Sequence, residues 1–379
     1  MNNPIRAGNR KQILGLILLL WLAILGLFIL QGGRLALLYL VGVSLGAVLL
    51  LGAVSFTSAY RRLFLYRDIS GVSAQLLMLL IASIIFTPLL IQGDILGQPV
   101  SGALAPVGGS VVVGAFAFGV GMQLAGGCGS GTLYLAGSGH PRMILVLLCF
   151  CFGSFWASLD MHWWQDWPSI PAISLIHDFE GGRGLAGQCA LFMMLFGLLH
   201  FLPGRRSDSL PATLVVAVIL LALLNAVTLI LAGHPWSITW GFTLWAGKLA
   251  VLLGWEPSLS PFWSGAFQIR ALQNSLFSDV TSVMNMGILS GALLAGRISK
   301  QLSDHTAQVK EVSIGPVIAA IIGGLLLGYG ARIAYGCNIG AMFSGIASGS
   351  LHGWVWLLAV LPGNWLGVKL RPLFGLSNE

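Results

Sequence analysis

Long apolar runs recur along the chain and are separated by short polar or glycine-rich segments. Many of these runs have about 20 residues, the length with which an α-helix crosses the hydrocarbon core of a bilayer. We therefore predict an all-α polytopic membrane protein with roughly 9–12 membrane helices. The predicted spans lie at about 13–30, 35–57, 71–91, 107–126, 143–158, 185–202, 212–232, 262–278, 281–297, 314–335 and 351–368. The apolar segment 240–255 fits either a short span or a re-entrant helix.

Basic residues between the runs predict the orientation of the chain. Arginines follow the second predicted span at 61–67, and three positive charges lie in the polar loop 297–311. Since cytoplasmic loops carry an excess of Lys and Arg, these segments and the N-terminus are predicted to be cytoplasmic. The tryptophan-rich stretch 160–171 is predicted to lie at the external interface, where aromatic residues gather. The helix before residue 128 then runs inward, and the helix before residue 337 runs outward.

Composition supports the membrane class and excludes several others. The chain has 379 residues, of which 56% are hydrophobic and 8% charged, whereas a soluble domain carries about 25% charged residues. Its net charge of +7 is spread over many loops, so we predict no nucleic-acid partner. The five cysteines form neither a C-x-x-C pair nor a zinc spacing, so no metal or cofactor is predicted.

Two segments of the chain repeat each other. Residues 119–134 read GVGMQLAGGCGSGTLY, and residues 328–343 read GYGARIAYGCNIGAMF. When Cys128 is aligned with Cys337, four glycines and one alanine coincide: 119 with 328, 121 with 330, 127 with 336, 131 with 340, and 125 with 334. Helix packing alone accounts for one such segment, but the recurrence of cysteine favours a shared function.

The opposite directions of these segments predict an inverted pseudo-two-fold repeat with two re-entrant Gly-Cys loops. An extra N-terminal membrane helix would occupy 1–34, the first half 35–206 and the second half 207–379. The two cysteine loops would then enter the membrane from opposite faces. This arrangement depends on segment 240–255 crossing the membrane fully.

The residues around the two cysteines suit an anion. Gly127, Gly129 and Gly336 break the helices and let a substrate approach the backbone closely. Such breaks expose N–H groups and positive helix ends, which attract anions. Asn338 adds amide donors, and Cys128 and Cys337 add soft, weak S–H donors.

One charged residue stands out near the second cysteine. Arg332 lies five residues before Cys337, at the repeat position that Gln123 occupies in the first segment. An arginine inside a membrane segment is a functional candidate, and it could line an anion path. The alternative is that its side chain extends to the interface or binds a backbone carbonyl.

These segments resemble the YeeE/YedE family of membrane proteins, a sulfur-transport group that includes thiosulfate uptake proteins. The resemblance covers roughly residues 35–371 and is carried by LAGGCGSGTLY (124–134), ARIAYGCNIGAMFSGI (331–346), SLHGW (350–354), VSFTSAYRRLF (54–64) and WGFTLWAGKLA (240–250). It implies an hourglass-shaped bundle in the bacterial inner membrane, with Cys128 and Cys337 at its waist. The family often has a third cysteine where this chain has Ser55, whose hydroxyl could still donate a hydrogen bond.

The resemblance makes a transporter rather than an enzyme the leading hypothesis. The expected substrate is a small sulfur oxyanion, thiosulfate, and the expected partner is a cytoplasmic sulfur carrier of the TusA or rhodanese kind. Two alternatives stay open: a transporter of a selenium species, and a membrane enzyme that relays sulfane sulfur through cysteine persulfides. The enzyme would require a thiolate, which apolar surroundings disfavour.

Overall fold

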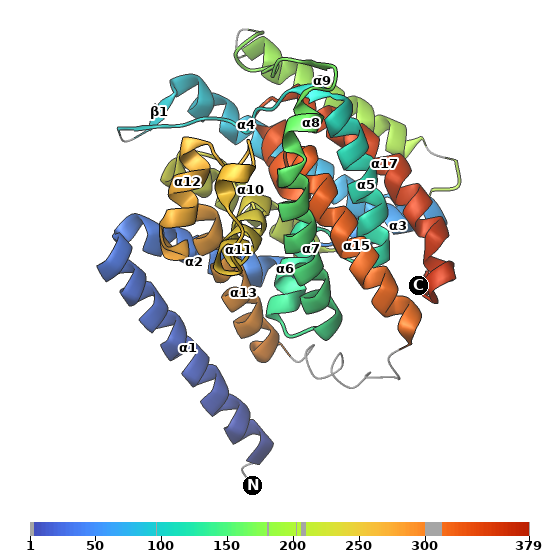
Figure 1. Ribbon diagram of the computed structural model, residues 1–379. Helices are drawn as coiled ribbons and strands as arrows, with labels where there is room; N and C mark the ends of the chain where they lie inside the picture. The colour runs from blue at the N-terminus through green and yellow to red at the C-terminus, as the bar shows by residue number, and fades with distance from the viewer. Residues whose placement is uncertain are drawn as a thin grey trace.

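The computed structural model describes residues 4–95, 97–179, 182–201, 203–205, 210–299 and 313–378. Within these ranges, eight helical segments are long and apolar enough to cross a membrane. They form one helical bundle, from which α1 (Pro4–Gln31) projects at the edge (Figure 1). The all-α polytopic architecture predicted from the sequence is therefore confirmed.

The long helices that follow α1 form the body of the bundle. They are α2 (Gly33–Leu51), α4 (Ser70–Gln92), α5 (Gly109–Ala125), α7 (Pro141–Leu159), α9 (Gly182–His200), α10 (Ala212–Ala232), α13 (Val280–Ile298), α15 (Ile314–Ile333) and α17 (Leu351–Leu370). Shorter helices connect them: α3 (Phe56–Tyr66), α6 (Gly129–Gly137), α8 (Met161–Gln165), α11 (Thr239–Leu252), α12 (Ala266–Gln273), the π-helix η3 (Asn338–Ser344) and α16 (Gly345–Ala347). Two small antiparallel ribbons join β1 (Asp94–Ile95) to β2 (Gln98–Pro99) and β3 (Val107–Gly108) to β4 (Ser169–Ile170).

The span predicted at about 262–278 is wrong. These residues form the eight-residue helix α12 and a 3₁₀ turn at Leu276–Ser278, both too short to cross a bilayer. Polar residues at 268, 270, 273 and 274 interrupt the apolar run. Lys248 on α11 donates hydrogen bonds to the carbonyl oxygens of Leu272 and Asn274, each 2.6 Å away, and so caps the C-terminal end of α12.

Glycines bring α5 and α15 into close contact. A Cβ atom on Gly114 would lie 2.7 Å from the carbonyl oxygen of Gly330, and one on Gly121 would lie 2.8 Å from that of Gly323. Small residues allow helix backbones to approach in this way inside a membrane. Because position 114 faces 330 while position 121 faces 323, the two helices run antiparallel.

Several helix pairs occur in matched form in the two parts of the chain. Helix α5 packs on α17, and α15 packs on α7; likewise α2 packs on α13, and α10 packs on α4. The predicted boundary between the halves, at 206/207, and most of the predicted cytoplasmic loop 297–311 lie outside the described residues. The repeat and the division of the chain into three parts therefore stay predictions.

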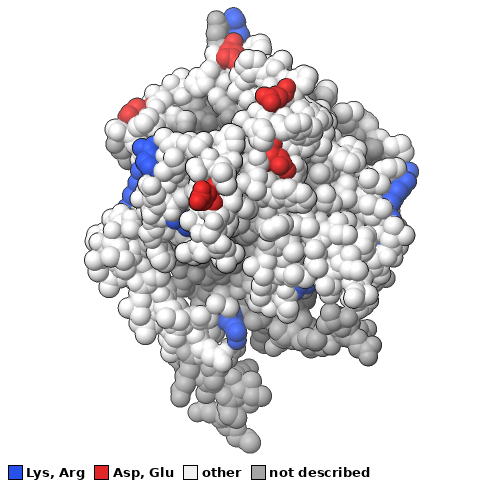
Figure 2. Space-filling view, in the orientation of Figure 1, with Lys and Arg blue, Asp and Glu red and all other residues white. Residues whose placement is uncertain are grey.

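The surface of the bundle is largely apolar. Figure 2 shows a face that is mostly uncharged, with acidic side chains confined to its upper part. Outward-facing positions carry large hydrophobic side chains such as Leu148 and Phe152, which are 63% and 59% exposed. An apolar exterior of this kind is expected of a protein that faces lipid.

Candidate functional site at two buried cysteines

Cys128 lies in a tight break between α5 and α6. Helix α5 is capped at its C-terminal end by Gly126, whose φ of 84° is left-handed and favours glycine. Cys128 is the N-cap of α6, and its Sγ atom accepts a hydrogen bond from the backbone N–H of Gly131 at 3.3 Å. The Oγ atom of Ser130 lies 3.4 Å from the same sulfur. The thiol is thus fixed at the positive end of a nine-residue helix and is buried.

Cys337 occupies the matching break after α15. It is the N-cap of the π-helix η3, and its Sγ atom accepts a hydrogen bond from the backbone N–H of Ile339 at 3.4 Å. Gly336 has no room for a side chain, because a Cβ atom there would lie 2.5 Å from the amide nitrogen of Ala341. Trp356 on α17 donates its indole N–H to the Gly336 carbonyl at 3.2 Å. The loop is therefore fixed by its packing against Ala341 and by the hydrogen bond from Trp356. Single π-helical turns such as η3 are often found at functional sites.

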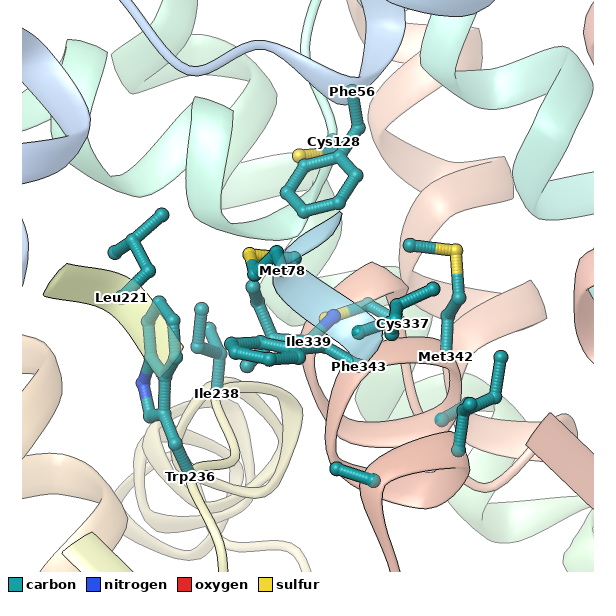
Figure 3. Close-up of a cluster of buried hydrophobic side chains, with 14 of the residues drawn as sticks. Phe56, Met78, Cys128, Leu221, Trp236, Ile238, Cys337, Ile339, Met342 and Phe343 are labelled. Carbon is teal, nitrogen blue, oxygen red and sulfur yellow. The ribbon is translucent and has the colours of Figure 1, made fainter. Parts of the chain in front are cut away.

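The two loops meet in the middle of the bundle. The Sγ atom of Cys337 lies 3.0 Å from the position that a Cβ atom on Gly129 would take. At Gly127 a Cβ atom would lie 3.3 Å from the amide nitrogen of Thr132, within the first loop itself. Figure 3 shows both cysteines in one buried cluster with Phe56, Met78 and Met342. The structure therefore brings Cys128, Gly129 and Cys337 together.

Several buried polar atoms near the starts of η3, α6 and α3 have no hydrogen-bond partner. Asn338 is fully buried, yet neither its Nδ2 nor its Oδ1 atom makes a hydrogen bond. The hydroxyl groups of Thr132 and Thr57 are also buried without a partner. Since a buried polar group without a partner costs about 1–3 kcal/mol, these atoms mark a place where a ligand or water is expected.

Thr57 was not singled out from the sequence, although a clue was present. The tripeptide Ser55-Phe56-Thr57 lies at the start of α3. The tripeptide Ser237-Ile238-Thr239 lies at the start of α11. The recurrence of S-x-T in the two parts of the chain could have identified both segments as a second repeated motif.

Ser55 lies in the loop between α2 and α3. Its hydroxyl group accepts a hydrogen bond from the backbone N–H of Ser58 at 3.2 Å and caps α3. The preceding carbonyl, of Val54, accepts a hydrogen bond from the hydroxyl of Tyr134 on α6 at 3.3 Å. Ser55 is therefore next to the residue that ties this loop to the Cys128 helix, while its own hydrogen bond stays within α3.

Arg332 lies in the last turn of α15. Its Nε atom is buried without a partner, and its guanidinium carbon lies 5.0 Å from the ring centre of Phe262. An arginine over an aromatic face is stabilised by the ring electrons. At the matching position, Gln123 donates to the carbonyl of Thr57 at 3.0 Å and to Oδ1 of Asn364 at 2.7 Å. The matched positions near the C-terminal ends of α15 and α5 thus carry a charged and a neutral side chain, respectively.

The remaining cysteines are separate from this site. Cys149 and Cys151 lie on α7 and Cys189 lies on α9, all as free thiols. In the described part of the chain, no three His, Cys, Asp or Glu side chains gather where they could hold a metal ion.

Comparison with known proteins assigns the family. Residues 51–366 match the family described as Sulphur transport. This chain belongs to the sulphur transport family. Among its relatives is a probable transporter YedE of Escherichia coli, 33% identical over 164 residues, which are 42% of this chain and 38% of that protein. The match thus spans less than half the length of YedE.

Two other relatives match over almost their whole length. The thiosulfate transporter TsuA of Spirochaeta thermophila is 26% identical over 345 residues, covering 86% of this chain and 96% of that protein. The thiosulfate transporter TsuA of Escherichia coli is 24% identical over 360 residues, covering 87% of this chain and 94% of that protein. The predicted membership of the YeeE/YedE group is confirmed.

Proposed function

We propose that this member of the sulphur transport family is an inner-membrane permease for a small sulfur-containing anion, thiosulfate, which passes through a narrow central path lined by Cys128 and Cys337. Two relatives named as thiosulfate transporters match more than four fifths of this chain. These relatives favour thiosulfate over a selenium species.

The observation that carries the proposal is the meeting of the two cysteine loops beside unpartnered polar atoms. The Sγ atom of Cys337 adjoins Gly129, the residue next to Cys128, so both thiols belong to one buried waist. Asn338, next to Cys337, has an amide group with no hydrogen bond. An anion at the waist would receive donors from Asn338 and the thiols.

Thiols suit this substrate because of their softness. Thiosulfate ends in a sulfur atom that is large and polarizable, and a neutral S–H group is a weak, polarizable donor. Weak donors bind the anion without trapping it, since permeation requires that each site also release its ion. A phosphate-type site with several strong cationic donors would hold the anion more tightly.

The packing of the helices supports a pseudo-two-fold path. Several packed pairs, each with one helix from either predicted half, occur in matched form, as α5 with α17 and α7 with α15. The helices that lead to the two cysteines run antiparallel, so the loops would approach the waist from opposite membrane faces. Arg332, at the end of α15, would attract the anion on the side of the Cys337 loop.

The waist is closed in this conformation, because both thiols are buried. The glycines on either side of the cysteines, Gly127, Gly129 and Gly336, provide the places where the backbone could shift to admit an anion. Passage would then require only a local opening of the loops.

Import of a dianion also needs a source of free energy. Moving two negative charges against a potential of 100 mV costs about 4.6 kcal/mol, twice the cost of a single charge. Rapid removal of thiosulfate in the cytoplasm by a sulfur carrier of the TusA or rhodanese kind would supply this free energy.

Uptake of thiosulfate labelled in its terminal sulfur, measured in proteoliposomes with competing anions, tests the proposal. We expect saturable uptake of the label that excess unlabelled thiosulfate inhibits and excess sulfate does not. Stronger competition by selenosulfate or selenite would make the selenium species the substrate instead. A persulfide on either cysteine after turnover would favour the sulfur-relay enzyme over the permease.

A further inference from the structure

Two arginines donate hydrogen bonds to the C-terminal end of α5, immediately before the Cys128 loop. Arg142, near the start of α7, donates from Nη2 to the carbonyl oxygen of Leu124 at 2.7 Å. Arg371, just after α17, donates from Nη1 to the carbonyl oxygen of Gln123 at 2.7 Å. Because these carbonyls belong to consecutive residues, the two guanidinium groups lie close together. Cations at a helix C-terminus stabilise the helix, which explains one hydrogen bond from each.

A third arginine lies on the neighbouring helix. Arg61 follows Thr57 by one turn of α3, so both side chains share a face of that helix. The backbone carbonyl of Thr57 accepts a hydrogen bond from the side-chain amide of Gln123. The backbone carbonyl of Gln123 in turn accepts the hydrogen bond from Arg371. Burial, and then repulsion from Arg61 and Arg142, lowers the pKa of Arg371 to about 10.

Helix capping does not account for all of this charge. Arg371 uses its other nitrogens on the Asn378 side chain and the Ser377 carbonyl, but the Nε atom of Arg142 is buried with no partner. The one ion pair within the described ranges joins Arg62 to Asp68. The Arg371 guanidinium group is therefore repelled by Arg61 and Arg142, no carboxylate among the described residues pairs with any of the three arginines, and an anion would relieve that repulsion.

The arginines also lie close to the cysteine loop. The Nη1 atom of Arg142 lies 3.8 Å from the position that a Cβ atom on Gly126 would take, two residues before Cys128. Arg332, by contrast, lies at the end of α15, which runs antiparallel to α5. The waist is thus flanked by arginine on both sides.

We propose that Arg61, Arg142 and Arg371 form a second oxyanion-binding site, on the predicted cytoplasmic side of the waist, where the anion is held after it passes Cys128. This inference rests on the proposed function for the direction of passage. The ligand is a small divalent oxyanion of tetrahedral shape, such as thiosulfate or sulfate. A phospholipid phosphate group has the same chemistry, so the test must separate the two sources.

Binding of sodium thiosulfate and sodium sulfate to the purified full-length protein tests the inference, with each salt matched by sodium chloride of equal ionic strength. The melting temperature is followed in a background that carries Arg332→Gln, so that the opposite arginine does not contribute. Arg61→Gln is the informative change, because Arg61 does not cap α5. Arg61→Lys keeps the charge, and Arg62→Gln is the matched control.

We expect Arg61→Gln to raise the apparent dissociation constant about tenfold, the usual effect of losing one charge-assisted hydrogen bond, and Arg61→Lys to restore part of the affinity. Arg62→Gln should leave the dissociation constant unchanged. Equal constants for Arg61→Gln and the control would overturn the inference.

Native mass spectrometry in nanodiscs made with and without phosphatidylglycerol separates the two sources. Retention of that lipid by the wild type but not by Arg61→Gln, with no effect of free thiosulfate or sulfate, would contradict the substrate assignment. The proposed function can fail independently: sulfate binding that depends on Arg61 would remain even if the protein does not import thiosulfate.

Discussion

The Sγ atom of Cys337 lies 3.0 Å from the place where a Cβ atom on Gly129 would be. The two cysteine loops, which are more than 200 residues apart in sequence, approach each other closely here and leave little space for a side chain at position 129. Gly129 therefore sets the distance between the two halves of the proposed waist.

Gly129→Ala should obstruct the waist. The added methyl group would push on the thiol of Cys337, and overpacking of this kind costs about 1–3 kcal/mol. Because the added methyl group stays beside the path when it opens, the anion meets an extra barrier of about 1–3 kcal/mol, and the uptake rate falls about 10- to 100-fold. The measurement is initial uptake of labelled thiosulfate in proteoliposomes. Gly197→Ala on α9, where nothing lies within 4 Å, is the control and should transport normally; equal rates for the two variants would rule out this role for Gly129.

Asn338→Leu should separate stability from transport. Replacing a buried amide that lacks hydrogen bonds with an apolar side chain of similar size should leave the free energy of unfolding unchanged or raise it by about 1–3 kcal/mol. Uptake should nevertheless fall, because the substrate loses its amide donor. Thermal melting and uptake are measured on the same preparation. A variant that is less stable and equally active would show that Asn338 is structural.

Arg332→Gln tests whether that guanidinium group attracts the anion. Loss of one charged donor is expected to raise the KM for thiosulfate about tenfold, with a smaller effect on the maximal rate. Uptake by the wild type should also weaken as sodium chloride is raised, because salt screens the attraction. Lys248→Gln removes a cation that caps α12 and should leave KM unchanged. The same KM in both variants would contradict the role of Arg332.

Asp68 predicts a pH effect on stability that is independent of transport. Burial tends to raise the pKa of this carboxyl group, but hydrogen bonds from Ser70 and the charge of Arg62 outweigh burial and hold it below its ordinary range. The resulting stabilisation is present above about pH 4 and is lost as the pH falls through the folded-state pKa. Asp68→Asn should therefore melt below the wild type at pH 7, and the difference should vanish in acid. A difference that is constant with pH would contradict this assignment.

The sequence predicted the features that depend on local composition. Apolar runs predicted most of the long helices, and the aligned Cys128 and Cys337 predicted two breaks of the same kind. The span at 262–278 failed because polar residues at 268, 270, 273 and 274 interrupt the run, and because the capping of α12 by Lys248 is a tertiary contact that a hydropathy pattern does not contain. The cluster of Arg61, Arg142 and Arg371 also escaped prediction, since tertiary packing brings α3, the start of α7 and the end of α17 to the C-terminal end of α5. The unpaired amide of Asn338 likewise becomes visible only once its neighbours are known.

The most direct test of the account is uptake of labelled thiosulfate by Cys128→Ser and Cys337→Ser in proteoliposomes, with Cys189→Ser on α9 as the control. Serine keeps the size of the side chain but replaces the soft thiol with a hard hydroxyl group. The account predicts that each of the two central substitutions lowers the uptake rate at least tenfold, while the control transports as the wild type does and all three variants melt at similar temperatures. Normal uptake by both central variants would contradict a path lined by the two thiols.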